Sequence, residues 1–309
     1  MERLAAEGER VTGTFRDVGE DRSWVPEGVV LRRVDLLDLD ATARLVEEAQ
    51  PELVFHLAAR SSVAASWREP LATISENAAM QLNLLEAIRK IQPRARVVVV
   101  GSCDEYGSVL PKENPVAETH ELRPASPYAL SKVVQDLMGL QYAEVDGMSI
   151  VRVRPFLQLG PRRQSHFVAG SFARQIAEAE ADEREPLIEV GNIDVQRDFL
   201  DVRDMARAYV AAAERGVPGQ VYNVATGRAH TPRDLLDTML SRSGLQFTVR
   251  EASELRRKHE PPVVIGDSSR FREATGWSPR ISFEQSAFDT LDYWRARVRA
   301  HSTSEGDLR

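Results

Sequence analysis

The sequence has 309 residues, 42% of them hydrophobic, so it can bury the core of one large domain or of a domain with a smaller lobe. Its 47 acidic and 40 basic side chains give a net charge of −7, which argues against binding to a nucleic-acid backbone. The single cysteine, Cys103, excludes a disulfide framework and indicates a reducing compartment. No apolar run approaches the ~20 residues that span a bilayer, and no signal peptide is visible. We expect a cytoplasmic protein with no nucleic-acid or membrane partner.

Short apolar runs alternate with amphipathic stretches in the first half of the chain, which predicts a parallel sheet covered by helices. Strands are predicted at residues 11–15, 28–33, 51–59, 95–100 and 149–155. Helices are predicted at residues 40–49, 76–90 and 128–145. The β-branched run ARVVVV suits the interior of such a sheet.

The pattern changes after Pro155. The later segments predict a helix at 172–181, short strands at 187–190 and 221–224, and a helix that begins at Pro232 with Thr231 as its cap. We therefore expect three parts, namely a domain built on the parallel sheet at 1–155, a smaller lobe at 156–300 with some chain returning to the first domain, and a disordered tail at 301–309.

Tyr128 and Lys132 are the first candidates for catalysis. They stand four residues apart in PYALSK, so a helix places both on one face. A nearby ammonium lowers the pKa of a tyrosine and lets it exchange a proton, although such a pair is more often a solvated helix face. Ser102 strengthens the case, because it follows the predicted strand at 95–100, and open α/β sheets bind ligands at that end of their strands.

Several longer segments extend this pattern in order from about residue 11 to residue 295: FHLAARSSVAASW, VVGSCDEYG, SPYALSK, RPFLQLGPR, VGNIDVQRDFLDVRDMARAY, GQVYNVATG and GDSSRFREATGW. With them the chain resembles the extended short-chain dehydrogenases/reductases of the nucleotide-sugar epimerase and dehydratase group. Two branches compete, GDP-mannose 4,6-dehydratase and GDP-4-keto-6-deoxy-D-mannose reductase, and the late segments are more similar to the reductase. The resemblance implies a Rossmann-like doubly wound parallel sheet, NADP(H) or NAD(H) as cofactor, a GDP-linked sugar as substrate, and a homodimer formed through the helices at 76–90 and 128–145. It makes residues 1–155 a truncated dinucleotide-binding domain and residues 156–300 mainly a nucleotide-sugar-binding lobe.

The resemblance also implies roles for particular residues. It assigns catalysis to Ser102, Tyr128 and Lys132. It assigns cofactor binding to Arg16, Asp35, Leu36, Ala58, Ala59 and Pro155, together with Tyr128 and Lys132. It assigns substrate binding to Ser61, Ser102, Arg197 and Arg257.

Three arginines of this set are candidates for binding the phosphate groups of the substrate and the cofactor. A bidentate guanidinium at Arg197 or Arg257 suits a sugar diphosphate, whereas surface salt bridging is the commoner role of arginine in an acidic protein. Arg16 follows the first predicted strand, where a basic residue tolerates the 2′-phosphate of NADP. The adjacent Asp17 weakens that preference, so NAD remains open.

Two departures from the family pattern matter. The dehydratases use a glutamate as a base where this chain has the shorter Asp104, which favours the reductase. Leu157 replaces an asparagine that usually holds the substrate, which puts the usual substrate in doubt. His56 and His166 lack neighbours at ligand spacing, so we expect no metal site.

The glycine-rich phosphate turn of such enzymes is not found before residue 11, where the sequence reads as the end of a helix. About 20 residues, one strand, a turn and half a helix, are expected to be missing. Either the true protein begins further upstream, or the chain begins at Met1 and binds NADP(H) poorly.

We expect the chain to reduce the 4-keto group of a GDP-4-keto-6-deoxy-hexose. The alternatives are a GDP-mannose 4,6-dehydratase, another nucleotide-sugar epimerase, and a catalytically impaired nucleotide-sugar-binding protein.

Overall fold

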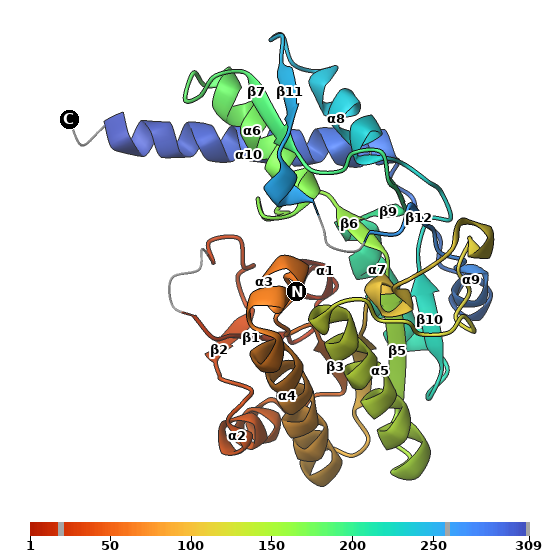
Figure 1. Cartoon of the computed structure of the whole chain (residues 1–309). Coiled ribbons are helices and arrows are strands. Elements are labelled where there is room, and N and C mark those ends of the chain that lie inside the picture. The colour runs from red at the N-terminus through yellow and green to blue at the C-terminus, as the bar shows by residue number, and fades with distance from the viewer. Residues whose placement is uncertain (18–21, 257–259, 307–309) are drawn as a thin grey trace. The chain divides into compact units, whose positions relative to one another are not determined.

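The computed structural model describes residues 1–17, 22–256 and 260–306 and divides the chain into two compact units (Figure 1). Unit one comprises Met1–Gly101, Ser126–Val153 and Ala212–Val221. Unit two comprises Ser102–Ala125, Arg154–Ala211 and Tyr222–Arg309. The chain thus leaves unit one near the predicted boundary at residue 155, but residues 102–125 group with unit two rather than with the dinucleotide-binding part.

The elements of unit one follow the predicted alternation. Its strands are β1 (Thr12–Phe15), β2 (Val30–Arg33), β3 (Leu53–His56), β4 (Arg96–Val100) and most of β5 (Ile150–Pro155). Its helices are α1 (Glu2–Ala6), α2 (Leu39–Ala49), α3 (Val63–Arg68), α4 (Pro70–Ile91) and α5 (Pro127–Val145). The short helix α3 was not predicted, and α4 begins earlier than predicted, with a proline in its first turn where no amide hydrogen is needed.

The strands pair in parallel, as expected for a doubly wound fold. β1 pairs with β2, while β4 pairs with β3 on one side and β5 on the other. The larger sheet has the order β10-β5-β4-β3, with β10 at Val221–Val224. Within the described residues no strand pairing joins β1 to β3. The sheet is therefore interrupted at the place that the first strand of a doubly wound fold occupies.

Helices α2, α4 and α5 share one apolar core with β4. Figure 1 shows α4 and α5 running side by side. Buried side chains of this core include Val46, Leu85, Ile88, Val97 and Ile150. Residues Val97–Val100 are all buried, which explains why that strand reads as a continuous β-branched run.

Unit two contains short strands and several helices. Its 3-10 turns are η1 (Cys103–Tyr106), η2 (Pro111–Glu113) and η3 (Ser253–Leu255). Its short strands form three parallel pairs, β6 (Leu157–Leu159) with β9 (Phe199–Asp201), β7 (Leu187–Val190) with β11 (Thr248–Glu251), and β8 (Gln196–Arg197) with β12 (Val263–Val264). Its helices are α6 (Val168–Glu180), most of α7 (Val202–Arg215), α8 (Pro232–Leu240), α9 (Ser269–Thr275) and α10 (Phe283–Gly306).

The long helix α10 packs along α6 and α8 (Figure 1). Phe172, Ile176, Leu235, Met239 and Leu291 are buried in the core between them. Helix α8 begins at Pro232 with Thr231 as its cap, as the sequence predicted. Helix α10 runs to Gly306, which is past residue 301, where the sequence analysis placed the start of a disordered tail.

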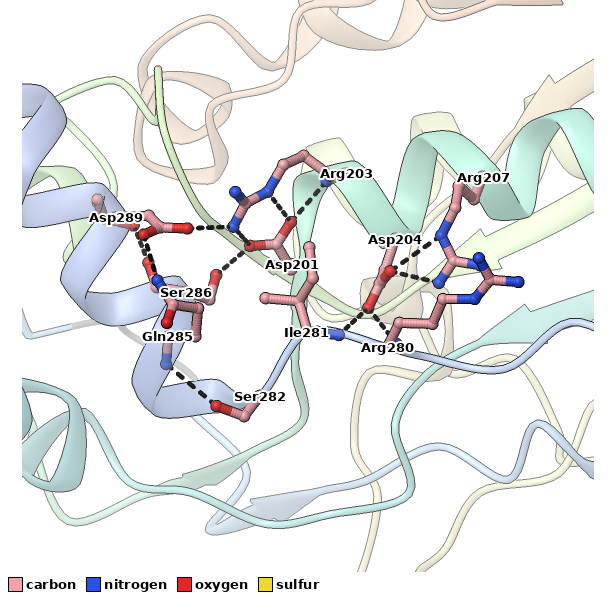
Figure 2. Close-up of polar contacts among 11 residues, drawn as sticks. Asp201, Arg203, Asp204, Arg207, Arg280, Ile281, Ser282, Gln285, Ser286 and Asp289 are labelled. Atoms are coloured by element: carbon pink, nitrogen blue, oxygen red, sulfur yellow. Dashed lines mark hydrogen bonds and ion pairs between the residues drawn. The ribbon is translucent and has the colours of Figure 1, made fainter. Parts of the chain in front are cut away.

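Two buried aspartates tie the start of α7 to the chain around α10 (Figure 2). The carboxylate of Asp201 accepts hydrogen bonds from Arg203 and from the hydroxyl of Ser286 at 2.6 Å. The carboxylate of Asp204 accepts from the main-chain N–H groups of Arg280 and Ile281 at 2.7 and 2.9 Å. Because both aspartates are almost inaccessible to solvent, these bonds compensate the cost of burying their charge.

Among the described residues, the membrane-span criteria of length and hydropathy are met by none of the helices.

Candidate functional site

Tyr128 and Lys132 lie in the first turns of α5. Ser126 caps this helix by accepting the N–H of Ala129 at 3.1 Å, so the pair has the predicted helical spacing. Tyr128 is 9% exposed and Lys132 is 4% exposed, so the pair does not lie on a solvent-exposed face of the helix. The Lys132 ammonium donates to the carbonyl oxygen of Val100 at 2.8 Å, and Val100 is the last residue of β4. A buried positive charge therefore lies at the carboxyl end of a central parallel strand.

A chain of buried amides holds α5 against α4 and β3. The Asn77 amide on α4 donates to the hydroxyl of Ser131 at 2.9 Å, and Ser131 donates in turn to the carbonyl of Tyr128. The Gln135 amide donates to the main-chain carbonyl of Asn77 at 3.0 Å and lies 3.2 Å from Nε2 of His56. Burial, with a smaller effect of the Lys132 charge, lowers the pKa of His56 to about 3, so this imidazole is neutral. The network fixes the helix that carries the tyrosine and the lysine.

Ser102 is the first residue of unit two and caps η1. Its Oγ accepts the N–H of Asp104 at 3.1 Å, and its own N–H donates to Glu105 Oε1 at 2.7 Å. A hydroxyl that already accepts one N–H still has its proton to donate, as a keto oxygen requires. Tyr128 and Lys132 belong to unit one and Ser102 to unit two, so the meeting of the three groups remains a prediction.

Cys103 follows the serine and is buried. Burial, reinforced by the negative charge of Asp104, raises the pKa of its thiol well above the ordinary value. The thiol is therefore protonated and unreactive, so Cys103 acts as a small buried residue just after β4.

The cofactor residues predicted in unit one follow the ends of its strands. Arg16 comes directly after β1, half exposed, with carboxylate oxygens of Asp17 and Glu76 at 3.5 and 4.0 Å. Two neighbouring acids further weaken the preference for a 2′-phosphate.

Asp35 and Leu36 follow β2. The carboxylate of Asp35 accepts the N–H of Leu37 at 3.0 Å, and the carbonyl of Leu36 accepts from the Asn83 amide at 2.9 Å. Ala58 and Ala59 lie beyond β3, which ends at His56 and is shorter than predicted. Pro155 is the buried last residue of β5 and belongs to unit two.

These residues fit the two ends of a nicotinamide dinucleotide. The buried Lys132 ammonium suits the nicotinamide end of the cofactor. The segment at Asp35 and Leu36, which hydrogen bonds fix in place, suits the adenosine end. The 309 residues contain no G-x-x-G-x-x-G or G-x-G-x-x-G turn of the kind that binds a pyrophosphate through backbone N–H groups.

The substrate residues have different surroundings. Arg197, in β8, is 6% exposed, and its main chain pairs with His230 through two hydrogen bonds of 2.9 Å. Its guanidinium is 3.8 Å from the carboxylate of Glu260. Because the arginine is buried, this ion pair is not a surface salt bridge. Ser61 is exposed in the segment between β3 and α3. Arg257 lies outside the described residues.

Both family departures lie in unit two. Asp104 lies in the first turn of η1. Leu157, in β6, packs partly buried against two apolar clusters, so this position supplies core packing where an amide was expected.

The sequence analysis missed a buried ion pair next to Ser102. Glu105 Oε2 accepts a hydrogen bond from Nε of Arg154 at 3.0 Å, and the two side chains are 0% and 5% exposed. Two signals were available in the sequence: Ser102-x-x-Glu105 is a capping-box pattern, and an arginine in a strand as apolar as IVRVRP must find a partner when it is buried.

The chain is similar to a known family and to several known proteins. The family model described as GDP-mannose 4,6 dehydratase matches residues 2–290. GDP-6-deoxy-D-mannose reductase of Pseudomonas aeruginosa is 34% identical over 87% of this chain and 88% of its own length. GDP-mannose 4,6 dehydratase 1 of Arabidopsis thaliana is 30% identical over 81% of this chain and 70% of its own length.

Solved structures show the same fold. The structure of RMD from Pseudomonas aeruginosa complexed with NADPH has a TM-score of 0.82 at 33% identity and covers 89% of this chain and 93% of its own. The UDP-glucose 4-epimerase of Thermus thermophilus in complex with NAD has a TM-score of 0.85 at 29% identity, with coverages of 95% and 94%. The predicted Rossmann-type α/β fold is thus confirmed, and these relatives hold the two cofactors that the sequence resemblance implied. The chain belongs to the GDP-mannose 4,6 dehydratase family.

Proposed function

We propose that this protein is a nucleotide-sugar oxidoreductase that reduces the 4-keto group of a GDP-4-keto-6-deoxy-hexose with NADPH or NADH. The observation that carries the proposal is the buried Tyr128–Lys132 pair, whose ammonium is bonded to Val100 at the end of β4. Ser102 follows Val100 by two residues in the chain. The relationship to the Pseudomonas aeruginosa reductase supports the same reaction.

Each group has a defined part in the reaction. The nicotinamide nucleotide, when bound, supplies the hydride that the carbonyl carbon receives. Tyr128 donates its phenolic proton to the keto oxygen, which becomes a hydroxyl, and solvent later returns a proton to the tyrosine. Lys132 stabilises the phenolate left by this transfer. Ser102 donates a hydrogen bond to the same keto oxygen and orients it.

The short carboxylate at Asp104 favours reduction over dehydration. A 4,6-dehydratase needs a base to remove a proton from the sugar, and an aspartate reaches one methylene less far than the glutamate that the resemblance implies. A reductase needs no base at this position. The competing activities of the same fold are a GDP-mannose 4,6-dehydratase and another nucleotide-sugar epimerase.

A second candidate function follows from the interrupted sheet. The described strands leave β1 and β3 unpaired with each other, and the sequence has no glycine-rich phosphate turn. The candidate of another class is a catalytically impaired nucleotide-sugar-binding protein. Arg197, Arg257 and Ser61 are the proposed sugar-diphosphate contacts in either case.

One assay separates these functions. The purified protein is mixed with GDP-4-keto-6-deoxy-mannose and NADPH, and nicotinamide absorbance is followed. A reductase consumes NADPH in proportion to product, whereas a dehydratase or epimerase converts its sugar nucleotide without consuming NADPH. Calorimetric titration with NADPH then tests the impaired protein, which is rejected if binding is micromolar.

Replacing the proposed proton donor tests the mechanism. Tyr128→Phe should lower kcat by about 10²–10⁴-fold, the usual contribution of a general acid, while nucleotide-sugar binding persists. Tyr142→Phe is the matched control on the same helix, because it removes a hydroxyl that donates to Glu86 at 2.7 Å. If Tyr128→Phe keeps full activity, the assignment is wrong.

We also propose a homodimer formed through α4 and α5. These helices expose leucines that a monomer would leave in water, at Leu71, Leu82, Leu130 and Leu137, with exposed fractions of 42 to 79%. Sedimentation equilibrium of the wild type and of Leu137→Glu tests the proposal. A wild-type monomer at assay concentration would reject it.

A further inference from the structure

A buried chain of polar side chains starts at the main chain of Ser102 and ends in the interior of unit two. Glu105, in the last turn of η1, makes two contacts with opposite ends of its carboxylate. Oε1 accepts the N–H of Ser102 at 2.7 Å, and Oε2 accepts Nε of Arg154 at 3.0 Å. The Glu105 side chain therefore connects the serine to an arginine on β5.

Arg154 is held by the buried Tyr106, and Tyr106 is held by the buried Asn223. Its Nη1 donates to the hydroxyl of Tyr106 at 3.1 Å, and the guanidinium lies over the same ring, 5.1 Å from its centroid. The Tyr106 hydroxyl donates to Oδ1 of Asn223 at 2.6 Å, and the Asn223 amide donates to the main-chain oxygens of Val116 and Asp267. Tyr106, Asn223 and Glu105 are all 0% exposed, so the arginine has a single well-defined position.

The effect on Ser102 is geometric. A carboxylate on its N–H fixes the main chain at residue 102, while the N–H of Asp104 fixes Oγ at 3.1 Å. The serine is thus held at its main chain and at its Oγ, and its hydroxyl proton remains available for an acceptor. A group held in this way loses little freedom when it binds a reacting oxygen.

We infer that Glu105, held by Arg154, is a positioning residue that orients the hydroxyl of Ser102 toward the substrate carbonyl. The inference rests on the proposed function, because it takes Ser102 as the residue that contacts the keto oxygen. In this proposal the pair acts on the reaction through the serine, to whose N–H Glu105 is bonded.

Two double variants isolate the hydrogen bond from the ion pair. Glu105→Leu/Arg154→Met removes both the ion pair and the acceptor for the Ser102 N–H. Glu105→Gln/Arg154→Met also removes the ion pair, but the amide oxygen of glutamine still accepts that N–H. A buried ion pair replaced by uncharged side chains of similar volume commonly leaves a folded protein. Circular dichroism and thermal unfolding confirm the fold of both.

We expect kcat of the Leu/Met variant to fall about 10- to 100-fold with KM unchanged, the size expected when a reacting group is misplaced by about 1 Å. The Gln/Met variant should recover most of the lost kcat. In a Ser102→Ala background the Leu/Met change should cost nothing more. Equal losses in the two double variants, or a further loss in the Ser102→Ala background, would overturn the inference.

A single variant and a second measurement keep the test decisive. Glu105→Asp retains the charge opposite Arg154 but shortens the acceptor, so it should lose kcat like the Leu/Met variant even if that variant folds poorly. Hydrogen exchange of the Ser102 amide, measured by NMR, should be slow in the wild type and the Gln/Met variant and fast in Glu105→Asp. If the wild type fails to reduce the keto sugar, the proposed function is wrong, and the exchange rates still decide whether Glu105 anchors Ser102: equal rates in all variants reject it.

Discussion

Replacing Asn77 by alanine should loosen the helix that carries Tyr128 and Lys132. Asn77 is fully buried on α4, and its amide group makes bonds to two other segments. Oδ1 accepts the N–H of Arg60 at 2.7 Å, and Nδ2 donates to the carbonyl of Arg60 at 3.3 Å and to Ser131 Oγ at 2.9 Å. Since each such bond contributes about 1 kcal/mol net, the loss of all of them should lower the free energy of unfolding by about 3 kcal/mol.

Asn83→Ala is the matched control for this prediction. Asn83 lies on the same helix and donates to the carbonyls of Leu36 and Leu37 at 2.9 and 3.1 Å, but it is only partly buried. Water can replace its amide there, so the cost should stay below about 1 kcal/mol.

Thermal and urea unfolding followed by circular dichroism measure both variants. At about 2–4 °C per kcal/mol for a protein of this size class, Tm should fall by about 6–12 °C for Asn77→Ala. The reductase assay should show a lower kcat as well, since Ser131 joins Asn77 to the main chain of Tyr128. If Asn77→Ala is no less stable than Asn83→Ala, the buried network does not hold α5 and this reasoning is refuted.

Two further predictions concern buried titratable groups. His56 has a pKa of about 3 in the folded protein and near 6.5 when unfolded, so the unfolded chain alone binds a proton between these values. Stability should fall as the pH drops through that window, by at most about 1.4 kcal/mol per pH unit, and His56→Gln should flatten the slope in urea titrations; parallel slopes would contradict this. Ser286→Ala, which removes the 2.6 Å bond to Asp201, should cost about 1.5–3 kcal/mol at neutral pH, and an unchanged Tm would contradict it.

Local sequence patterns predicted most of the elements. Periodicity and turn residues located β1 to β5, α2, α5 and the start of α8 to within a few residues, because each pattern depends on neighbours in the chain. Helix α3 was missed because six residues are too few to show a helical period. The polar residues from 301 were expected to form a disordered tail, whereas α10 runs to Gly306.

Contacts between segments far apart in the sequence could not be predicted from local patterns. The capping pattern of Ser102 and Glu105 is visible in the sequence, but nothing in it pairs Glu105 with Arg154, 49 residues later. The same holds for the bonds from Asn77 to Ser131, 54 residues apart. Which residues become hydrogen-bond partners depends on how β4, β5 and the helices pack together.

The sequence by itself determined the family, the fold class and the identity of the candidate proton donor, because these depend on residue types at short, regular spacings. Only the tertiary structure decided that Lys132 is buried against the end of β4, that Arg197 is a buried cation, and that Ser102 is anchored by a carboxylate. The physical reason is that burial removes water as a hydrogen-bond partner. Each buried polar group must then find another partner, and only the folded chain shows which one it finds.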